Sequence, residues 1–479
     1  MTVKCPVRIR WRINCTISGL IVTTERGNSQ FEYCYKVVIL WIDFLYKITS
    51  MFQSIGLFII SYLLKILQYK EVSNLMVFEM VGKISLGKET DKFKPYSEHK
   101  YDSGWVKRRI MFNAICGDNR HLLTVDAGSF EDENKGFVYT FSKGSVDDSG
   151  NKVKGESLKI PFKDRLTSPK LAEVAEFKKF VFDLEKPNRR YKLEKAAEKI
   201  KEGTSLTDEE LKDLELDNES EVNDALEKSN KKRHEFISEW DFAEFIKKVI
   251  DSGKYADKKF YIKGNADYSY SDNKQQVYES YIPQRIYLAA DDADEYSTGT
   301  VKIIFNKDSL DDMSVEEKGK YYVNGFMFEY DHNRKGNIPV PVTITIPVAP
   351  DDADEKAKKK VEAIKHKFMV DDDTYKELGV EVNMLNGAQK VEITDDMLTD
   401  EQKEDLDCGL ITLDDIRADL GGSVYGDRVQ EYQFKKIARG YSRGRVDTVY
   451  TEDDMVIKPI EAELPEGTED LFDDDSDEL

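Results

Sequence analysis

The sequence predicts a mainly β protein with helical connectors, an α+β chain that holds two small five-stranded barrels in tandem. Three observations lead to this fold class. The chain of 479 residues is long enough for two to four domains. Short runs of alternating apolar and polar residues recur in two blocks after residue 76, and a Lys/Glu-rich stretch separates the blocks. About five short strands in about 90 residues suit a Greek-key barrel better than a sandwich or a parallel sheet.

The composition excludes several protein classes. Hydrophobic residues make up 40% of the chain, with 4 Trp, 25 Tyr and 24 Phe among them, so the chain can form real cores and is not disordered as a whole. Five cysteines in a chain of this length exclude a disulfide scaffold, and the absence of a CxxC pair argues against a zinc site. The five scattered histidines leave little material for histidine-based catalysis.

Residues 1–75 differ in charge from the rest of the chain. They carry a net charge of +5, which leaves −26 for the remaining residues. Residues 48–67 are apolar and long enough to span a membrane, so one hypothesis is an anchor. The other is a leader read from a wrongly chosen start, because residues 70–72 can be encoded by a purine-rich ribosome-recruiting sequence just before Met76. N-terminal sequencing of the natural protein distinguishes the two, since a first residue upstream of Met76 contradicts the leader.

Residues 76–168 are predicted to form the first barrel, of the OB-like type. Alternation predicts its strands at residues 77–84, 105–116, 121–125, 137–141 and 158–162. A helical connector follows over residues 169–258. It begins with a helix over 169–184, predicted from apolar residues at helical spacing, namely Leu171, Val174, Phe177, Val181 and Leu184. A Lys/Glu-rich exposed insertion over 185–235, with a helix start at Thr207, and an amphipathic helix over 236–250 complete the connector.

Residues 259–348 are predicted to form the second OB-like barrel. Its strands are expected at residues 259–270, 275–288, 299–305, 320–330 and 340–347. Residues 349–458 read as a mixed α/β region with a Lys-rich helix over 356–368 and a basic loop. Residues 461–479 hold ten acids and no Lys or Arg, so residues 459–479 are predicted to be a disordered acidic tail.

The strand at 105–116 carries the first group of candidate binding residues. Alternation places Trp105, Lys107 and Arg109 on one face and Arg108 on the other, with Arg120 just beyond the following turn. Cations neutralise phosphates and flat side chains stack on unpaired bases, so this mixture suits a single-strand binder. The alternative is a charged edge strand with Trp105 packed into the core.

Two further groups combine aromatic side chains with cations. The second block contributes Tyr261, Lys263, Tyr268, Tyr270, Tyr281 and Arg285, although tyrosine is also a good strand former and part of this group is expected to be packing. Residues 433–445 are the most basic stretch after Met76 and contribute Lys435, Lys436, Arg439, Tyr441, Arg443 and Arg445. The alternative for this stretch is a loop whose arginines pair with acids such as Asp427 and Asp447.

These features resemble a known family. The order of two strand-rich blocks, a helical connector and an acidic terminus, with the stretches at residues 93–96, 103–109 and 282–287, is similar to phage single-stranded DNA-binding proteins with tandem OB folds of the replication-protein-A type. The resemblance covers residues 76–479 and brings no catalytic signature. It implies a partner-binding tail, here Leu471, Phe472, Asp473, Asp474, Asp475 and Leu479, although this tail lacks the usual hydrophobic tip.

The leading hypothesis is a non-enzymatic, sequence-tolerant single-stranded DNA-binding protein of phage replication or recombination, in the cytoplasm of an infected bacterial host. Motifs for nucleotide binding, nucleophilic serine and zinc hydrolysis are absent from the sequence, and no cofactor or metal is expected. Replication or recombination proteins are expected as partners of the tail. The alternative is a membrane-tethered or virion-associated interaction scaffold, favoured if residues 48–67 are a real span. A nuclease is a third hypothesis, since carboxylates are plentiful but unorganised.

Overall fold

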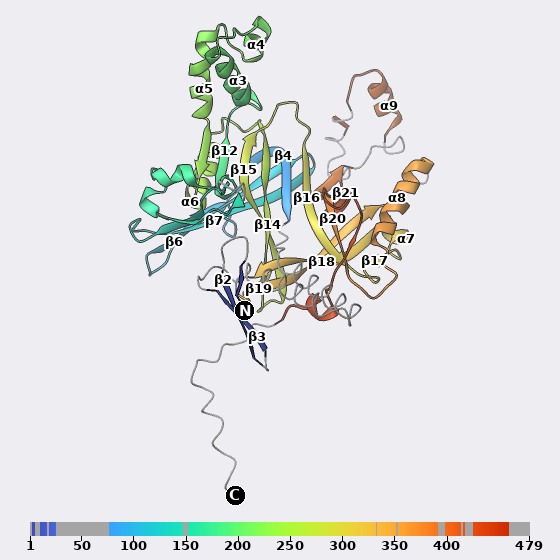
Figure 1. The fold of residues 1–479 in the computed structure, drawn as a ribbon. Coiled ribbons are helices and arrows are strands. Elements are labelled where there is room, and N and C mark those ends of the chain that lie inside the picture. The colour runs from blue at the N-terminus through green and yellow to red at the C-terminus, as the bar shows by residue number, and fades with distance from the viewer. Residues whose placement is uncertain are drawn as a thin grey trace.

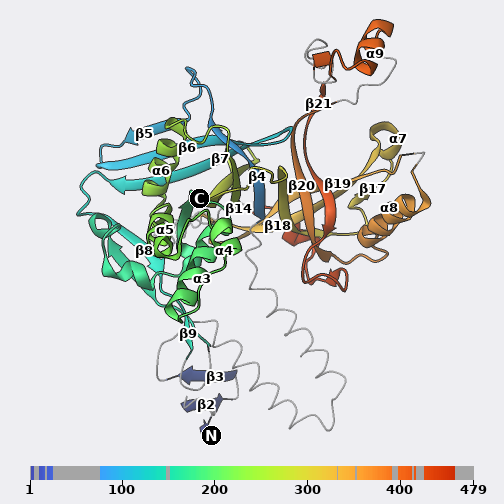
Figure 2. The same ribbon diagram turned by 90° about the horizontal axis from the view of Figure 1, so that it is seen from above.

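The computed structural model describes residues 2–4, 10–16, 19–24, 76–146, 152–331, 333–350, 353–390, 398–412, 415–416 and 425–458. Within these ranges the protein is mainly β, and most strands belong to one large mixed sheet. Figures 1 and 2 show β4, β14 and β16 between two groups of strands, with the helices α3, α4 and α5 projecting from one group. The apolar segment at 48–67 and the acidic tail lie outside the described residues.

The strands before residue 290 have the following bounds: β1 Thr2–Lys4, β2 Arg10–Thr16, β3 Gly19–Thr24, β4 Val77–Leu86, β5 Tyr96–Lys100, β6 Trp105–Cys116, β7 Asn119–Phe130, β8 Phe137–Phe141, β9 Ser145–Val146, β10 Lys152–Val153, β11 Ser157–Pro161, β12 Phe180–Asp183, β13 Arg233–Phe236, β14 Lys259–Ser271 and β15 Gln276–Leu288. The later strands are β16 Tyr296–Phe305, β17 Leu310–Asp311, β18 Lys320–Asp331, β19 Gly336–Pro347, β20 Lys376–Lys390, β21 Tyr425–Ile437 and β22 Val446–Asp447. β1, β2 and β3 form a small antiparallel sheet of their own.

The α-helices are α3 Arg189–Lys201, α4 Asp208–Asp213, α5 Val222–Asn230, α6 Glu239–Asp251, α7 Val315–Lys318, α8 Glu355–Phe368 and α9 Asp400–Asp407. Short 3-10 helices are η1 Phe162–Asp164, η2 Pro169–Glu173, η3 Glu176–Lys178, η4 Glu219–Glu221 and η7 Glu452–Met455. No helix among the described residues is both long enough and apolar enough to cross a membrane.

The strand pairings close a first circuit of five strands. β4 pairs antiparallel with β6, β6 with β7, β15 with β14, and β14 with β4, while β7 and β15 run parallel through Leu123 and Tyr281. The helix α6 lies in the chain between the third strand, β7, and the fourth, β14. It begins at Ser238, whose hydroxyl accepts a hydrogen bond from the Trp240 amide, and it buries Phe242 and Ile246 in the core.

A second circuit repeats this order. β16 pairs with β18, β18 with β19, β21 with β20, and β20 with β16, all antiparallel, while β19 and β21 run parallel at Ile344 and Tyr432. Here α8 lies between the third strand, β19, and the fourth, β20. The two circuits are joined because β4 also pairs with β16. The chain thus contains the same arrangement of five strands and one helix twice.

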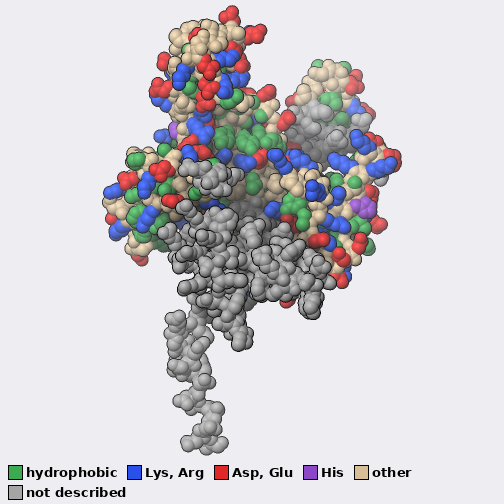
Figure 3. All heavy atoms as spheres, in the orientation of Figure 1, with side chains coloured by type: hydrophobic (Ala, Val, Ile, Leu, Met, Phe, Trp, Pro, Cys, Tyr) green, Lys and Arg blue, Asp and Glu red, His purple; other side chains and the backbone are tan. Residues whose placement is uncertain are grey.

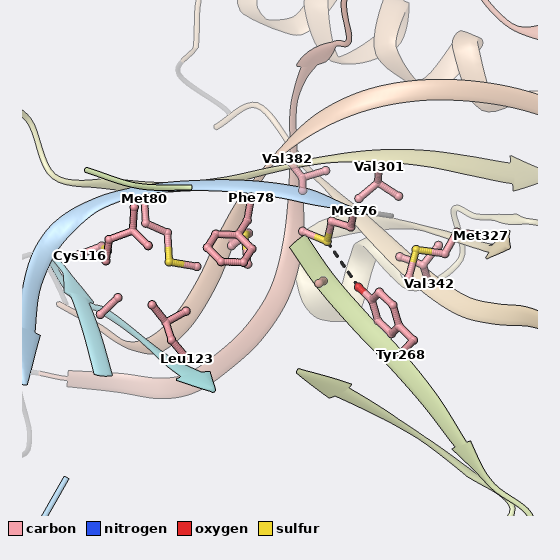
Figure 4. Close-up of a cluster of buried hydrophobic side chains, with 14 of the residues drawn as sticks. Met76, Phe78, Met80, Cys116, Leu123, Tyr268, Val301, Met327, Val342 and Val382 are labelled. Carbon is pink, nitrogen blue, oxygen red and sulfur yellow. Dashed lines mark hydrogen bonds between the residues drawn. The ribbon is translucent and has the colours of Figure 1, made fainter. Parts of the chain in front are cut away.

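One continuous core fills both circuits. Met76, Phe78 and Met80 alternate with half-buried residues and point inward from β4 or from the residue before it, and all three are fully buried. Figure 4 shows Met76 between side chains of the two circuits, with its sulfur 3.5 Å from the hydroxyl of Tyr268. Because these side chains belong to a single cluster, the two circuits share a core rather than forming separate ones.

The Lys/Glu-rich insertion forms helices, as predicted. α3, α4 and α5 lie between β12 and β13 and pack around a small core of their own that includes Leu193, Leu214 and Val222. α4 begins with the predicted acidic turn, and Thr207 and Glu210 form a reciprocal capping box. Figure 3 shows acidic and basic side chains interspersed over this projection.

Two fold predictions are wrong. Residues 169–184 do not form an α-helix: η2 and η3 are followed by β12, in which Val181 and Phe182 are buried between β13 and β15. The predicted grouping of strands also fails. β14 and β15 complete the first circuit instead of opening the second, and β8 pairs with β11 outside the large sheet.

Candidate nucleic-acid interface

The outward side of β6 and β7 carries rings and cations together. Along β6 the buried residues Arg108, Ile110 and Phe112 alternate with more exposed ones, as predicted from the sequence. Trp105 is 38% exposed and lies edge-on against Phe130 of β7, at 5.1 Å between ring centroids. We name the outward residues Trp105, Lys107, Arg109 and Phe130 the β6–β7 face.

The adjoining strand β5 extends this surface. His99 pairs in register with Lys107, and its ring lies 4.5 Å from that of Tyr101, which is 45% exposed. Gly128 is opposite Lys107, and a Cβ at this position would meet the Trp105 ring, so the small residue leaves room for the indole. His99, Tyr101 and Phe130 were not predicted from the sequence, because their relation to Trp105 depends on strand pairing.

The cations of the β6–β7 face share one carboxylate. Arg109 donates two hydrogen bonds to Asp126, at 2.5 and 2.6 Å, and the Lys107 Nζ is 3.5 Å from the same side chain. Partial burial alone would raise the pKa of Asp126, but the hydrogen bonds and charges of Arg109 and Lys107 lower it overall. All three side chains are about two-fifths exposed, so the ion pairs are open to solvent and to competing anions.

A second group of rings crosses four strands of the sheet. The register places Tyr296 of β16 beside Val81 of β4, then Tyr261 of β14, then Tyr287 of β15. Tyr261 and Tyr287 are stacked, with centroids 6.2 Å apart. We name Tyr261, Tyr287 and Tyr296 the tyrosine row. Of its members only Tyr261 was predicted from the sequence as a binding residue.

Charged residues line the tyrosine row. Two residues further along β14 than Tyr261, Lys263 donates to Glu79 at 2.6 Å and is paired across β14 and β15 with Arg285. Arg285 has no carboxylate partner among the described residues and donates to the Glu176 carbonyl oxygen at 3.4 Å. Desolvation and the neighbouring Glu79 raise the pKa of Tyr261, so its hydroxyl stays neutral. The structure therefore brings Tyr261, Lys263 and Arg285, three of the candidate binding residues, onto one side of neighbouring strands.

Two predicted binding residues, Arg108 and Tyr268, are buried instead, and a third, Tyr281, is half-buried. Arg108 is 8% exposed, donates to Glu98 and Glu244, and lies 3.8 Å from the centroid of the Trp240 ring. Tyr268 is 7% exposed and donates to Glu279 at 2.7 Å. Tyr281 meets the hydroxyl of Tyr432 at 2.9 Å, and burial raises its pKa. These side chains hold strands together, because each points to the inner side of its strand.

The remaining tyrosine of the second group, Tyr270, is half-buried. Its hydroxyl donates to Gln275 at 2.7 Å, and the Arg334 guanidinium lies 5.1 Å from its ring centroid. Arg120, in contrast, is exposed at the start of β7 and has no ion-pair partner among the described residues.

The basic loop is partly structural. Arg445 donates to the carbonyl oxygens of His366, Lys367 and Met369, and so caps the end of α8. Lys435 and Lys436 both pair with Glu381, at 2.8 and 3.1 Å.

The turn itself is fixed by a tyrosine and two glycines. The Tyr441 ring packs against Gly379 and its hydroxyl donates to Glu377, while Gly440 and Gly444 adopt positive φ angles.

Arg439 and Arg443 are exposed, and in the described part of the chain neither has an ion-pair partner. Asp447, one of the acids considered as a partner of this loop, pairs with Lys376 instead. Of the five cations, these two arginines are available to a ligand without breaking a contact.

The described residues offer no group of three or more His, Cys, Asp and Glu side chains placed to hold a metal ion. The tail residues Leu471, Phe472, Asp473, Asp474, Asp475 and Leu479 lie outside the described ranges.

Comparisons with known proteins leave the family open. No protein-family model matches the chain, and no curated protein matches it. A solved structure of a deletion mutant of the single-stranded DNA binding protein from Thermus aquaticus aligns with 65% of this chain and 88% of that chain, at 7% identity and a TM-score of 0.22. A superposition with this score does not establish a common fold, so the function is argued from the residues of this chain.

Proposed function

We propose that this protein is a sequence-tolerant single-stranded DNA-binding protein without enzymatic activity, acting in phage DNA replication or recombination. It protects unpaired strands by stacking bases on aromatic side chains and by neutralising phosphates. The observation that carries the proposal is the β6–β7 face, where Trp105 and Phe130 lie beside Lys107 and Arg109 on an outward surface. Base stacking on an aromatic side chain contributes about 1–3 kcal/mol per base and tolerates any sequence.

The repeated strand order supports the same proposal. We infer that each circuit is an OB-like barrel, because both have five strands in the same order, a parallel pair of the third and fifth strands, and a helix before the fourth. OB-like barrels bind oligonucleotides on the face of their second and third strands. In the first circuit these strands are β6 and β7, which carry the rings and cations.

Net charge does not oppose a polyanionic ligand here. The chain carries −21 overall, but ten of its acids lie in residues 461–479. Affinity for a strand depends on the local potential at the binding face rather than on net charge. We propose that the acidic tail binds replication or recombination proteins, and that the protein works in the cytoplasm of an infected bacterial host.

Binding of poly-dT and of duplex DNA, measured by fluorescence anisotropy at two salt concentrations, tests the proposal. We expect tighter binding to poly-dT than to duplex DNA. For each phosphate neutralised on a single strand, log K should fall by about 0.7 per tenfold increase in salt concentration. Trp105→Ala should weaken poly-dT binding by roughly tenfold, and Trp105→Phe should retain most of it, because a ring remains. Equal binding to both DNA forms, or binding to neither, contradicts the proposal.

A further inference from the structure

The hairpin of β8 and β11 exposes three aromatic rings on one side. Phe137, Tyr139 and Phe141 alternate along β8 and are 43%, 68% and 45% exposed. The opposite side of the hairpin is buried, where Val138 and Leu158 pack with Ile160 and Val174. The hairpin therefore has its own core side, and the three rings are not part of it.

Two lysines lie over these rings. Lys159, opposite Tyr139 in the register, places its Nζ 3.8 Å from the centroid of Phe137 and 5.6 Å from that of Tyr139. Lys178 lies 5.4 Å from the Phe141 ring and 5.7 Å from Phe177, which is 68% exposed. Among the described residues neither lysine forms a salt bridge, although the charge of Lys178 acts on the Glu239 carboxyl and lowers its pKa against the larger effect of burial. We name the rings Phe137, Tyr139, Phe141 and Phe177, with Lys159 and Lys178, the aromatic hairpin.

We propose that the aromatic hairpin is a second stacking surface for unpaired bases, outside both strand circuits. The inference rests on the proposed function for the identity of its ligand. Alternate residues of a strand are about 6.6–6.8 Å apart, roughly twice the 3.4 Å rise per nucleotide of a duplex strand, so a stretched single strand can offer one base to each ring. Lys159 and Lys178 lie where they can meet the phosphates between those bases.

The hairpin also lies next to the β6–β7 face in the chain. β8 begins seven residues after Phe130, and the amide of Glu131 donates to the carbonyl oxygen of Gly104, the residue before Trp105. Figure 2 shows β8 on the same side of the molecule as β5, β6 and β7. A strand bound along the β6–β7 face can therefore continue onto the hairpin.

A nucleic-acid ligand fits the hairpin better than a lipid surface or an apolar protein partner. Both lysines stand over ring faces, so insertion of the rings into a bilayer or a dry interface would carry unpaired charges with them. A single strand needs no such burial, because bases can stack on the ring surface that the lysines leave exposed while the cations stay near phosphate and water.

The test compares oligo-dT of two lengths, about 8 and about 30 nucleotides, because one OB-like barrel covers about 4–16 nucleotides. The variant F137A/Y139A/F141A removes the rings in the full chain. Tyr191→Ala is the matched control, since Tyr191 is 61% exposed in α3 and also lies under a lysine, Lys195, at 5.9 Å. We expect the triple variant to bind the long oligomer at least tenfold more weakly and the short one unchanged, and Tyr191→Ala to match wild type with both.

Photo-cross-linking with 5-iododeoxyuridine in the long oligomer gives an independent readout. We expect an adduct on the peptide that contains Tyr139 or Phe141. If wild type binds both oligomers and the triple variant binds them equally well, the hairpin is not a stacking surface, although the proposed function stands. If wild type binds neither oligomer, both fail. Binding of wild type to phosphatidylserine vesicles that the triple variant loses, with unchanged DNA binding, overturns the inference in favour of a membrane contact.

Discussion

Asp126 lies between Arg109 and Lys107 on the β6–β7 face, where it accepts two hydrogen bonds from the Arg109 guanidinium and forms an ion pair with the Lys107 ammonium. Similar carboxylates hold three other candidate cations: Glu79 pairs with Lys263, and Glu381 pairs with Lys435 and Lys436. In the free protein these acids orient the cations and keep them in place. A bound strand must replace each carboxylate by a phosphate, so every such acid lowers the affinity for DNA.

This competition gives the first residue-scale prediction. Asp126→Asn keeps the shape of the side chain but removes its charge, so Lys107 and Arg109 are no longer neutralised. We expect poly-dT binding to tighten by roughly two- to tenfold, with a steeper dependence on salt. Asp213→Asn, which removes an exposed partner of Lys192 in the helical insertion, is the control and should leave binding unchanged. Unchanged or weaker binding by Asp126→Asn would show that these two cations do not meet phosphates.

At the scale of single elements, the basic loop combines two kinds of arginine. Arg445 occupies the last carbonyls of α8, whereas Arg443 is exposed without a described partner. Sequence alone could not separate the two, because the loop offers five cations with the same local composition. The difference depends on where α8 ends in space.

The element-scale prediction separates the two roles. Arg445→Gln should lower the free energy of unfolding by about 1 kcal/mol, because it removes hydrogen bonds from the C-terminal carbonyls of α8. It should leave the salt dependence of poly-dT binding unchanged. Arg443→Gln should leave the free energy of unfolding unchanged. It should reduce the slope of log K for poly-dT against log salt concentration by about 0.7. Urea unfolding and anisotropy titrations of both variants measure this. The same effect from both substitutions would contradict the division of roles.

The elements themselves were largely predictable. All ten strands expected in the two blocks are present, because alternation of apolar and polar residues is a local signal that burial on one face of a sheet enforces. The helix predicted over 169–184 failed for a related reason. Leu171 and Val174 pack in an apolar cluster and Val181 is buried, but these residues lie in and beside a 3-10 turn and in a strand, which can present the same spacing.

At the scale of the whole molecule, the pairing of strands was not predictable. β14 pairs with β4 instead of beginning the second predicted barrel. This pairing joins residues more than 170 positions apart, which no local sequence pattern encodes. The candidate site was half predictable for the same reason. Trp105, Lys107 and Arg109 follow from alternation within one strand, whereas the tyrosine row needs the register of four strands. The aromatic hairpin was missed because an exposed FVYTF run reads like a core strand.

The junction between the two circuits is polar as well as apolar. His121 of β7 is 1% exposed and donates from Nε2 to the Ser297 hydroxyl of β16 at 3.0 Å, and Ser297 donates to the carbonyl oxygen of Met384 at 2.7 Å. The Nδ1 atom of His121 has no partner among the described residues. Burial lowers the pKa of His121 to about 4, although the nearby Met384 carbonyl acts to raise it. The ring is therefore neutral at the junction at ordinary pH.

This neutral histidine predicts how the stability of the whole molecule depends on pH. Below pH 6.5 the unfolded chain binds a proton at His121, whereas the folded chain does not bind it until about pH 4. The stability that the neutral His121 contributes is therefore fully present above pH 6.5 and is lost as the pH falls toward 4. The full loss is about 3 kcal/mol. His121→Gln can still donate to Ser297 but does not titrate. Urea unfolding gives the free energy of unfolding of wild type and variant at each pH. We expect wild type to lose stability relative to the variant as the pH falls from 6.5 to 4. From pH 7 to 8 the difference between the two should stay constant. Parallel profiles at all pH values would mean that His121 is accessible to protons in the folded protein, and that the junction is more open than its packing indicates.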